Sequence, residues 1–362
     1  MKTLSIDCKT LSSYLSVLIP IFSRNASVQI SKCVKITERN DKMILRANNG
    51  HVDHEIEIEP GLIEKGFEAV IDGLILQKIC NALPVQPITL ESKEKQLFVS
   101  SNQGKSTLYN ESVKDFLVDK NVNNGTEFEI ESKELRRHIK NTVFAVNPAF
   151  PMQALQNILF ELKNGVFKCV STDGIILCAS ASNGQTEEGR FLLPPDMANI
   201  LIKSIPEGET IKVEFDDRSA IFNYEGGKIG FALSVFTYPD WTVLIPDYKT
   251  SFKVDRNPLI GALKRCSIFA TIQEFVNLTL SENNLNISIY NSELGNGNNE
   301  DLDIEYSGKE FEITFKPKPF IDILNSIEDE QVIIGVNDDE TGMFYINTGN
   351  EQRLIMPFKK VF

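Results

Sequence analysis

Long apolar runs and paired cysteines are both missing from this chain of 362 residues. The longest strictly apolar stretch covers only residues 17–22, whereas a membrane-spanning helix needs about 18 apolar residues. The N-terminal sequence MKTLSIDCK places the charged Asp7 and Lys9 where a signal peptide needs its apolar region, so we expect a cytoplasmic protein. The six cysteines lie far apart without a C-x-x-C pair, which predicts buried, reduced thiols rather than disulfides or a zinc site.

Catalytic side chains are also scarce. The only histidines are His51, His54 and His138, and no P-loop, dinucleotide-binding, nucleophile-elbow or H-E-x-x-H motif occurs. His51 and His54 have a spacing found in metal sites, but no Cys or His pair accompanies them. The acidic pairs at 216–217 and 338–339 fit hairpin turns better than Mg²⁺ sites, because aspartate in a turn bonds to its own backbone. We therefore predict a protein that is not an enzyme, with no catalytic residue, metal or cofactor.

The chain contains an internal repeat. Three segments that start near residues 7, 132 and 255 begin with polar residues and continue with apolar residues at helical spacing. Leu11, Leu135 and Leu259 hold the matching position, 124 residues apart each time. A second helical segment follows in each copy, over 73–84, 195–206 and 318–328, and these segments end 122 residues apart. Such regular spacing of two landmarks indicates three homologous domains.

The repeat also sets the expected boundaries and fold. We predict domains at 1–123, 124–248 and 249–362, with turn-forming residues at both joints. Around the helical segments lie alternating runs typical of strands, with hairpin turns expected at Asn164-Gly165 and at 282–284. We expect the asparagine-rich stretch 291–303 to be a loop. Each domain is thus predicted to be α+β, with two helices packed on antiparallel sheet.

The net charge of −13 argues by itself against nucleic acid as a partner, but the charge is unevenly placed. The six helical segments together carry 11 basic and three acidic residues, so the remainder is strongly acidic. Charges on one amphipathic helix often serve only to solvate it, but a bias shared by six helices favours a basic surface that holds phosphates without reading bases. The candidate DNA-facing residues are Lys9, Arg24, Lys78, Lys133, Arg136, Arg137, Lys140, Lys203, Lys264, Arg265 and Lys318.

Short motifs in a fixed order carry a resemblance to a known family. They are T-D-G at 172–174, F-L-L-P at 191–194, Y-P-D at 238–240 and L-I-M-P-F at 354–358. Together with the three-fold repeat and the basic helices, they resemble the bacterial β sliding clamp, the processivity subunit of DNA polymerase III. The resemblance runs along the whole chain.

That resemblance implies a head-to-tail homodimer of six clamp domains, closed into a ring around duplex DNA without sequence specificity. It implies that the first domain of one chain meets the third domain of the next, with Leu108 facing Ile268 and Phe269. Ser106 stands where the family often has an aromatic residue, which predicts an altered joint. The ring would tether the replicative polymerase during DNA replication.

The resemblance further implies an apolar groove near the junction of the second and third domains, which would bind short linear peptides of the polymerase and the clamp loader. By position it comprises Leu155, Thr172, Gly174, Ile175, Ile176, Leu177, Pro239, Val243, Leu244, Leu354, Met356, Pro357 and Phe358. Several of these fit a hydrophobic core equally well. Ile175, Ile176 and Val243 replace polar or basic residues common in the family, so we expect a more apolar groove with altered peptide preference.

Two other function classes stay open on sequence alone. The acidic turns could serve a hydrolase or a metal-dependent nuclease, which Mg²⁺-dependent cleavage and an Asp338→Asn variant would reveal. A repeat-built scaffold unrelated to DNA would be favoured if replacing Arg136, Arg137 and Lys140 by glutamate caused no loss of DNA association.

Overall fold

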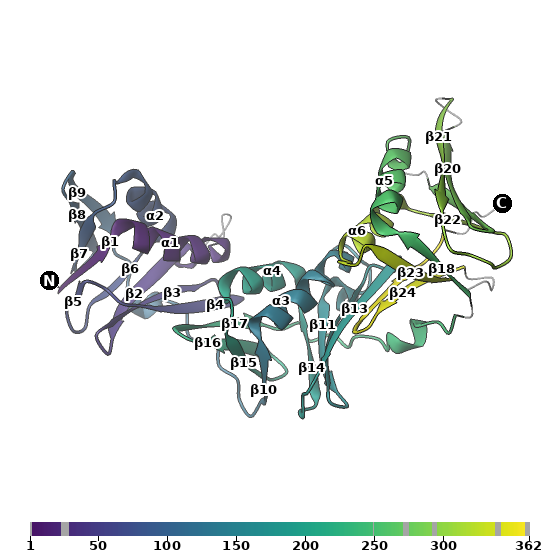
Figure 1. Cartoon of the computed structure of the whole chain (residues 1–362). Coiled ribbons are helices and arrows are strands. Elements are labelled where there is room, and N and C mark those ends of the chain that lie inside the picture. The colour runs from purple at the N-terminus through teal and green to yellow at the C-terminus, as the bar shows by residue number, and fades with distance from the viewer. Residues whose placement is uncertain are drawn as a thin grey trace. The chain divides into compact units, whose positions relative to one another are not determined.

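The computed structural model describes residues 2–22, 29–248, 250–270, 275–291, 295–336 and 342–358. Within these ranges the chain runs three times through one order of elements: a strand, a helix, a group of strands, a second helix and three final strands (Figure 1). The helix pairs are α1 (Cys8–Leu18) and α2 (Gly73–Ala82), α3 (Ser132–Lys140) and α4 (Pro195–Ser204), and α5 (Arg256–Ser267) and α6 (Pro317–Asn325). No helix in the described ranges is long and apolar enough to cross a membrane.

The strands of the first repeat are β1 (Lys2–Asp7), β2 (Cys33–Arg39), β3 (Lys42–Asn48), β4 (Val52–Ile58), β5 (Leu62–Ile63), β6 (Glu68–Asp72), β7 (Pro87–Lys93), β8 (Gln96–Ser101) and β9 (Gly104–Tyr109). Those of the second are β10 (Thr126–Glu131), β11 (Ile158–Lys163), β12 (Val166–Thr172), β13 (Ile176–Asn183), β14 (Gly189–Leu193), β15 (Thr210–Phe215), β16 (Ser219–Tyr224) and β17 (Gly227–Ala232). Those of the third are β18 (Thr250–Asp255), β19 (Val276–Ser281), β20 (Asn284–Asn291), β21 (Asn296–Asp303), β22 (Phe311–Phe315), β23 (Gln331–Val336), β24 (Phe344–Thr348) and β25 (Glu351–Ile355).

Each repeat builds two half-sheets. The first half-sheet joins the opening strand to the three strands after the second helix, in the orders β1-β7-β8-β9, β10-β15-β16-β17 and β18-β23-β24-β25. The second half-sheet holds four strands from between the helices, in the orders β6-β2-β3-β4, β14-β11-β12-β13 and β22-β19-β20-β21, while the short β5 pairs with β1. Because the order recurs three times, β9, β17 and β25 are equivalent strands, and so are β4, β13 and β21.

The half-sheets of neighbouring repeats merge. β17 pairs antiparallel with β4, and β25 pairs antiparallel with β13, so two eight-stranded sheets run across the two joints. The chain accordingly separates into two compact units that divide the middle repeat: residues 1–136 with 196–235, and residues 137–195 with 236–362. The contact between neighbouring repeats, which we call a joint, is thus a continuous ladder of main-chain hydrogen bonds that lies within one unit.

The helices begin where the sequence provides caps. The Asp7 carboxylate accepts hydrogen bonds from the backbone nitrogens of Lys9 and Thr10, at 2.9 and 3.0 Å, and Asp72 accepts one from Ile75 N at 2.9 Å. Apolar residues spaced three or four apart then place one face of the helix against the core. In α1 this face carries the fully buried Leu11, Leu15 and Leu18.

In every repeat a basic side chain near the start of the first helix caps the end of the second. Lys9 Nζ donates to the carbonyl oxygens of Cys80 and Asn81 at 3.3 and 3.0 Å. The Arg136 guanidinium donates to the carbonyl oxygens of Ile202 and Ile205. Arg256 donates to those of Leu324 and Asp329, at 3.3 and 2.9 Å. These bonds satisfy carbonyls that have no partner inside the helix.

Several predictions about the fold are confirmed, and one is wrong. The six helical segments and the hairpin at Asn164-Gly165 form as expected, the two turn residues having φ of 53° and 79°. All six cysteines are free and buried. Residues 296–303, predicted as part of a loop, instead form β21 and pair with β20 along their whole length. Asparagine side chains bridge that hairpin, as between Asn286 and Asn299 at 2.8 Å, so the composition that suggested a loop serves a cross-strand ladder.

Candidate functional site

Two strands of the repeat lack the partner that their equivalents have. β9 ends the sheet β5-β1-β7-β8-β9, and β21 ends the sheet β21-β20-β19-β22, with no further strand beside either of them in the described residues. The equivalent strands are all paired, since β17 joins β4 and β25 joins β13 over five residue pairs each. An open edge offers unpaired backbone N–H and C=O groups to another chain.

The two strands carry opposite charge. Lys105 lies on β9, whereas β21 carries the acidic residues Glu300, Asp301 and Asp303. Both strands are mostly exposed. Lys105 is already paired with Glu91 at 2.7 Å, so its charge does not by itself attract β21, whereas a pair of two β21 strands would oppose like charges.

The predicted interface residues lie in these same sheets or beside them. Leu108 is half-buried on β9, opposite the fully buried Leu97 of β8. Ile268 follows α5 with 77% of its surface exposed, and Phe269 packs partly against the core of the third repeat. An apolar side chain as exposed as Ile268 is consistent with a contact surface.

Within each unit, the existing joint buries polar groups. In the first unit His54 on β4 is fully buried, and its Nε2 lies 2.6 Å from Tyr224 Oη. Burial lowers the pKa of His54 to about 3, so this imidazole is neutral at physiological pH. His54 thus joins two repeats through its contact with Tyr224.

A buried network supports the joint of the second unit. The His138 ring contacts the hydroxyls of Ser180 and Ser182 at 2.7 and 3.1 Å, and Ser180 donates to Glu351 at 2.8 Å. The guanidinium of Arg137 forms an ion pair with Glu351. Burial raises the pKa of Glu351 above its usual value. The charge of Arg137 therefore offsets the cost of a buried carboxyl group within the chain.

The predicted DNA-facing cations fall into two groups. The side chains of Lys9, Arg136 and Arg137 bond within the protein, Arg265 forms an ion pair with Glu300 at 2.5 Å and Lys318 forms one with Asp322 at 2.6 Å. Five exposed lysines on the helices have no hydrogen-bond or ion-pair partner among the described side chains: Lys78, Lys133, Lys140, Lys203 and Lys264. Arg24 lies outside the described residues. The free positive charge is thus carried by lysines, which suit phosphate contacts that must form and break.

Most of the predicted groove residues gather on one face of the second unit. Leu155, Leu177 and Leu354 belong to one apolar cluster with Tyr238 and Trp241, against which Met356 packs. Leu177 and Leu354 are adjacent across the β13–β25 pair and are 1% and 2% exposed, so they form a floor. Pro239, Val243 and Leu244 stand exposed beside this floor, on the segment that crosses it. Exposed apolar side chains over an apolar floor suit a peptide with apolar anchors.

The T-D-G motif forms the turn that leads into β13. Asp173 Oδ1 accepts from the backbone nitrogens of Ile175 and Ile176, both at 2.8 Å, and Thr172 Oγ1 donates to Ile176 O at 2.6 Å. Gly174 has a φ of +81°, and a Cβ there would lie 2.9 Å from the Phe150 ring. The motif therefore fixes the backbone next to the groove rather than supplying contact side chains.

Ile176 is a correction to the predicted groove. Its side chain is 2% exposed and packs in the core of the third repeat, together with Ile355. Successive strand residues point to opposite faces, so Ile176 and Leu177 cannot both line the groove. Ile175 also packs partly against that core. At the end of the chain, Phe358 stacks on Phe275 with ring centroids 3.8 Å apart, and Pro357 precedes it, half-buried.

No arrangement in the described residues resembles a catalytic centre. Asp216 accepts from the backbone nitrogens of Arg218 and Ser219, both at 2.8 Å, as expected for an aspartate in a turn. The acidic pair at 338–339 lies outside the described residues. Among the described residues, no three His, Cys, Asp or Glu side chains are grouped as metal ligands.

Comparison with known proteins finds similarity to DNA polymerase III beta subunits, also named beta sliding clamps. Residues 242–358 match the family described as DNA polymerase III beta subunit, C-terminal domain. The beta sliding clamp of Chlamydia pneumoniae is 22% identical over 364 residues, covering 96% of each chain. That of Treponema pallidum is 27% identical over 287 residues, covering 74% of this chain and 76% of its own. Residues 242–358 therefore match one domain of the DNA polymerase III beta subunit, and the chain as a whole is similar to beta sliding clamps.

Solved structures share the fold of this chain. The DNA polymerase III subunit beta from Pseudomonas aeruginosa superimposes with a TM-score of 0.93 at 21% identity, covering 99% of this chain and 100% of its own. The beta subunit from the DNA polymerase of Streptococcus pyogenes gives 0.92 at 22% identity with the same coverage. These likenesses confirm the α+β fold of three repeats.

The residues near the groove that the sequence did not reveal are mostly structural. Phe150 packs beneath the T-D-G turn, and Tyr238 and Trp241 complete the groove floor at 3% and 4% exposure. Only the Y-P-D motif pointed to Tyr238. The burial of both aromatic residues depends on where the crossing segment meets the sheet.

Proposed function

We propose that this chain is a DNA sliding clamp, a non-catalytic accessory subunit that encircles duplex DNA and tethers a replicative polymerase in the cytoplasm. The observation that carries the proposal is the pair of open strands. Two of three equivalent joints form inside the chain, and the third joint is missing because its strands, β9 and β21, lie in the first and last repeats. A second copy supplies the missing partner strands.

Two copies then make two identical joints, each between β9 of one chain and β21 of the other. Such a heterologous contact gives a ring if its rotation closes and a filament if it does not. Six repeats joined through equivalent strand pairs favour closure, since all six joints share one geometry. The acidic residues of β21 disfavour the pairing of two β21 strands, which leaves β9 as the better partner.

The ring needs no base-specific contact to DNA. The five free lysines, Lys78, Lys133, Lys140, Lys203 and Lys264, provide point charges for phosphate oxygens. The net charge of −13 limits attraction elsewhere on the surface. Contacts of this kind are weak and depend steeply on salt, which permits sliding. Tethering then raises the effective concentration of a bound polymerase at its template.

The tether itself is a peptide in the groove formed by Leu155, Leu177, Leu354 and Met356, with Pro239, Val243 and Leu244 at its rim. The partners are segments of the polymerase and of the clamp loader with leucine and phenylalanine anchors.

The groove is tested by Val243→Asp. Val243 is 75% exposed, so the change should leave stability unaltered while placing a charge beside apolar anchors. Binding of a labelled peptide that contains Leu-Ser-Leu-Phe should weaken at least tenfold. Val235→Asp, at 76% exposure, is the matched control and should bind normally. Equal binding by both variants would contradict the groove.

The encircling function is tested on nicked circular DNA. Protein loaded onto the circle should stay bound through gel filtration at about 0.2 M salt and leave after a restriction enzyme linearises the DNA. Retention on the linear form equal to that on the circle would contradict a topological link, whatever the affinity for DNA.

A further inference from the structure

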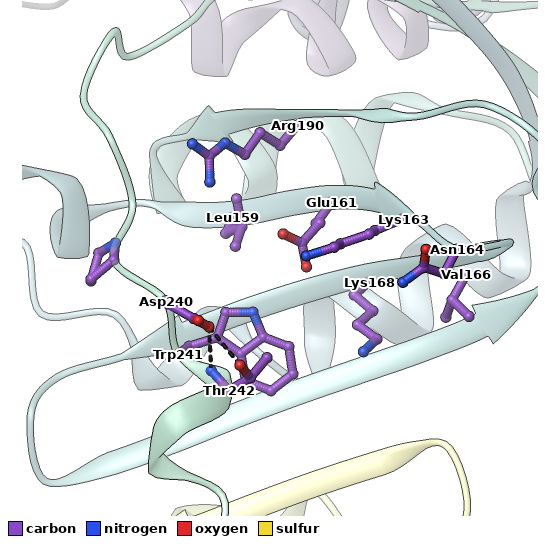
Figure 2. Close-up of a pocket in the computed structure, with 11 residues that line it drawn as sticks. Leu159, Glu161, Lys163, Asn164, Val166, Lys168, Arg190, Asp240, Trp241 and Thr242 are labelled. Carbon is purple, nitrogen blue, oxygen red and sulfur yellow. Dashed lines mark hydrogen bonds between the residues drawn. The ribbon is translucent and has the colours of Figure 1, made fainter.

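A charged cavity of about 370 Å³ lies beside the groove in the second unit (Figure 2). Its walls come from the β11–β12 hairpin, from β14 and from the segment Pro239–Thr242. Glu161 and Lys163 lie on β11, Lys168 on β12 and Arg190 on β14, with Asp240 on the crossing segment. Neither the sequence motifs nor the groove described above accounts for this group of side chains.

The cavity and the groove share walls. Leu159 and Trp241 line the cavity and also belong to the apolar cluster of the groove floor. Leu159, Glu161 and Lys163 alternate along β11 and therefore face the same side of the sheet. At about 3.4 Å per residue, the strand places Lys163 about 13 Å beyond Leu159, the reach of about four residues of an extended peptide.

The cavity is more basic than its surroundings. Three cations and two carboxylates line it, in a chain whose net charge is −13. Glu161 lies directly across from both Arg190 and Lys168, so one carboxylate faces two cations. Lys168 Nζ lies 5.1 Å from the centroid of the Trp241 ring. Asp240 is engaged by Thr242, through its backbone nitrogen at 3.0 Å and its hydroxyl at 2.6 Å.

Two of the cations remain available. Lys163 and Arg190 are exposed, and neither forms a hydrogen bond or an ion pair with another described residue. Figure 2 shows their side chains extending from different strands around the cavity. A carboxylate that enters there meets excess positive charge next to a low-dielectric aromatic wall, where charge pairs are stronger than in open water.

We propose that this cavity is an acidic-residue subsite of the groove: it binds an aspartate or glutamate that flanks the apolar anchors of the same peptide. This inference rests on the proposed function of the groove and specifies its partner. Partner segments with acidic flanks would be preferred over neutral ones, and the preference would come from Lys163 and Arg190.

The test uses the full-length chain and three labelled synthetic peptides with one Leu-Ser-Leu-Phe anchor. One carries Asp-Asp-Asp before the anchor, one carries it after the anchor, and one carries serines at both flanks. One of the acidic peptides should bind the wild type about fivefold tighter than the serine peptide at about 50 mM salt, and the advantage should shrink at about 500 mM.

The double variant Lys163→Gln, Arg190→Gln should lose this advantage and keep its affinity for the serine peptide. Lys93→Gln, Lys95→Gln removes the same charge from the exposed β7–β8 hairpin and should keep the advantage, which separates a local effect from net charge. If neither acidic peptide binds tighter than the serine peptide, the subsite is overturned while the groove stays intact. Failure of all three peptides to bind would overturn both the groove and the subsite.

Discussion

At the residue scale, the structure divides basic side chains that look alike in sequence. Lys133, Arg136 and Lys140 lie on one helix and were all predicted to face DNA. Only Arg136 is held by carbonyl oxygens at the end of α4, whereas Lys133 and Lys140 are exposed and without bonded partners. The planar guanidinium of Arg136 can donate to two carbonyl oxygens at once, whereas the exposed lysines make no such bonds.

Replacing Arg136 by alanine should therefore reduce stability rather than DNA affinity. The loss of two charge-assisted hydrogen bonds predicts a decrease of about 1.5–3 kcal/mol in the free energy of unfolding, measured by urea denaturation. Lys133→Ala and Lys140→Ala should change it by less than about 0.5 kcal/mol and instead weaken DNA retention. Arg136→Ala with unaltered stability would show that the cap contributes nothing.

His54 makes a separate residue-scale prediction, which concerns pH. Its pKa falls from 6.5 to about 3 on folding, so the unfolded chain binds this proton more readily between those values. Stability from this residue is therefore complete above about pH 6.5 and declines as the pH falls toward 3, by about 1.4 kcal/mol per pH unit. Between pH 6.5 and 5, the free energy of unfolding of the wild type should fall by about 2 kcal/mol more than that of His54→Gln. His51→Gln, at an exposed position, should keep the wild-type slope, and an equal slope for His54→Gln would contradict the buried neutral imidazole.

At the element scale, the proposal depends on the free edge of β9. Asn110 N donates to Lys95 O, which fixes the alternation of the β8–β9 ladder and leaves the backbone groups of Lys105, Thr107 and Tyr109 facing outward. Proline at an outward-facing position is tolerated by the monomer but cannot donate to a new strand.

Thr107→Pro should therefore keep the monomer folded, with a melting temperature within about 2 °C of the wild type. Self-association, measured by light scattering, should weaken at least tenfold. Leu108→Pro is the matched change one residue away, where the N–H faces β8, and should lower the melting temperature clearly. Unaltered association of Thr107→Pro would exclude β9 as the contact strand.

Elements with a strong local signal were predictable from sequence. The helix positions followed from apolar spacing and from caps such as Asp7, and the Asn164-Gly165 turn followed from its need for positive φ. The strand at 296–303 was missed, because its asparagines bond across the hairpin and local composition cannot show a cross-strand partner. For the same reason the sequence could not show that Ile176 and Leu177 face opposite sides, or that Arg190 lies across from Glu161.

At the scale of the whole molecule, three repeats build a chain with two filled joints and one open pair. The excess acidic charge outside the helices keeps DNA away from most of the surface, while unbonded lysines on the helices remain for the phosphates. Neither property requires chemistry at an active site. The proposed ring requires, in addition, that the open strands β9 and β21 find each other in a second copy.

Equilibrium sedimentation over a wide range of protein concentration tests that requirement most directly. The mass should rise from that of one chain to that of two and then stay constant, because a closed pair leaves no free β9 or β21 edge. A mass that stays at one chain into the tens of micromolar, or that keeps growing past two chains as an open filament would, contradicts the ring.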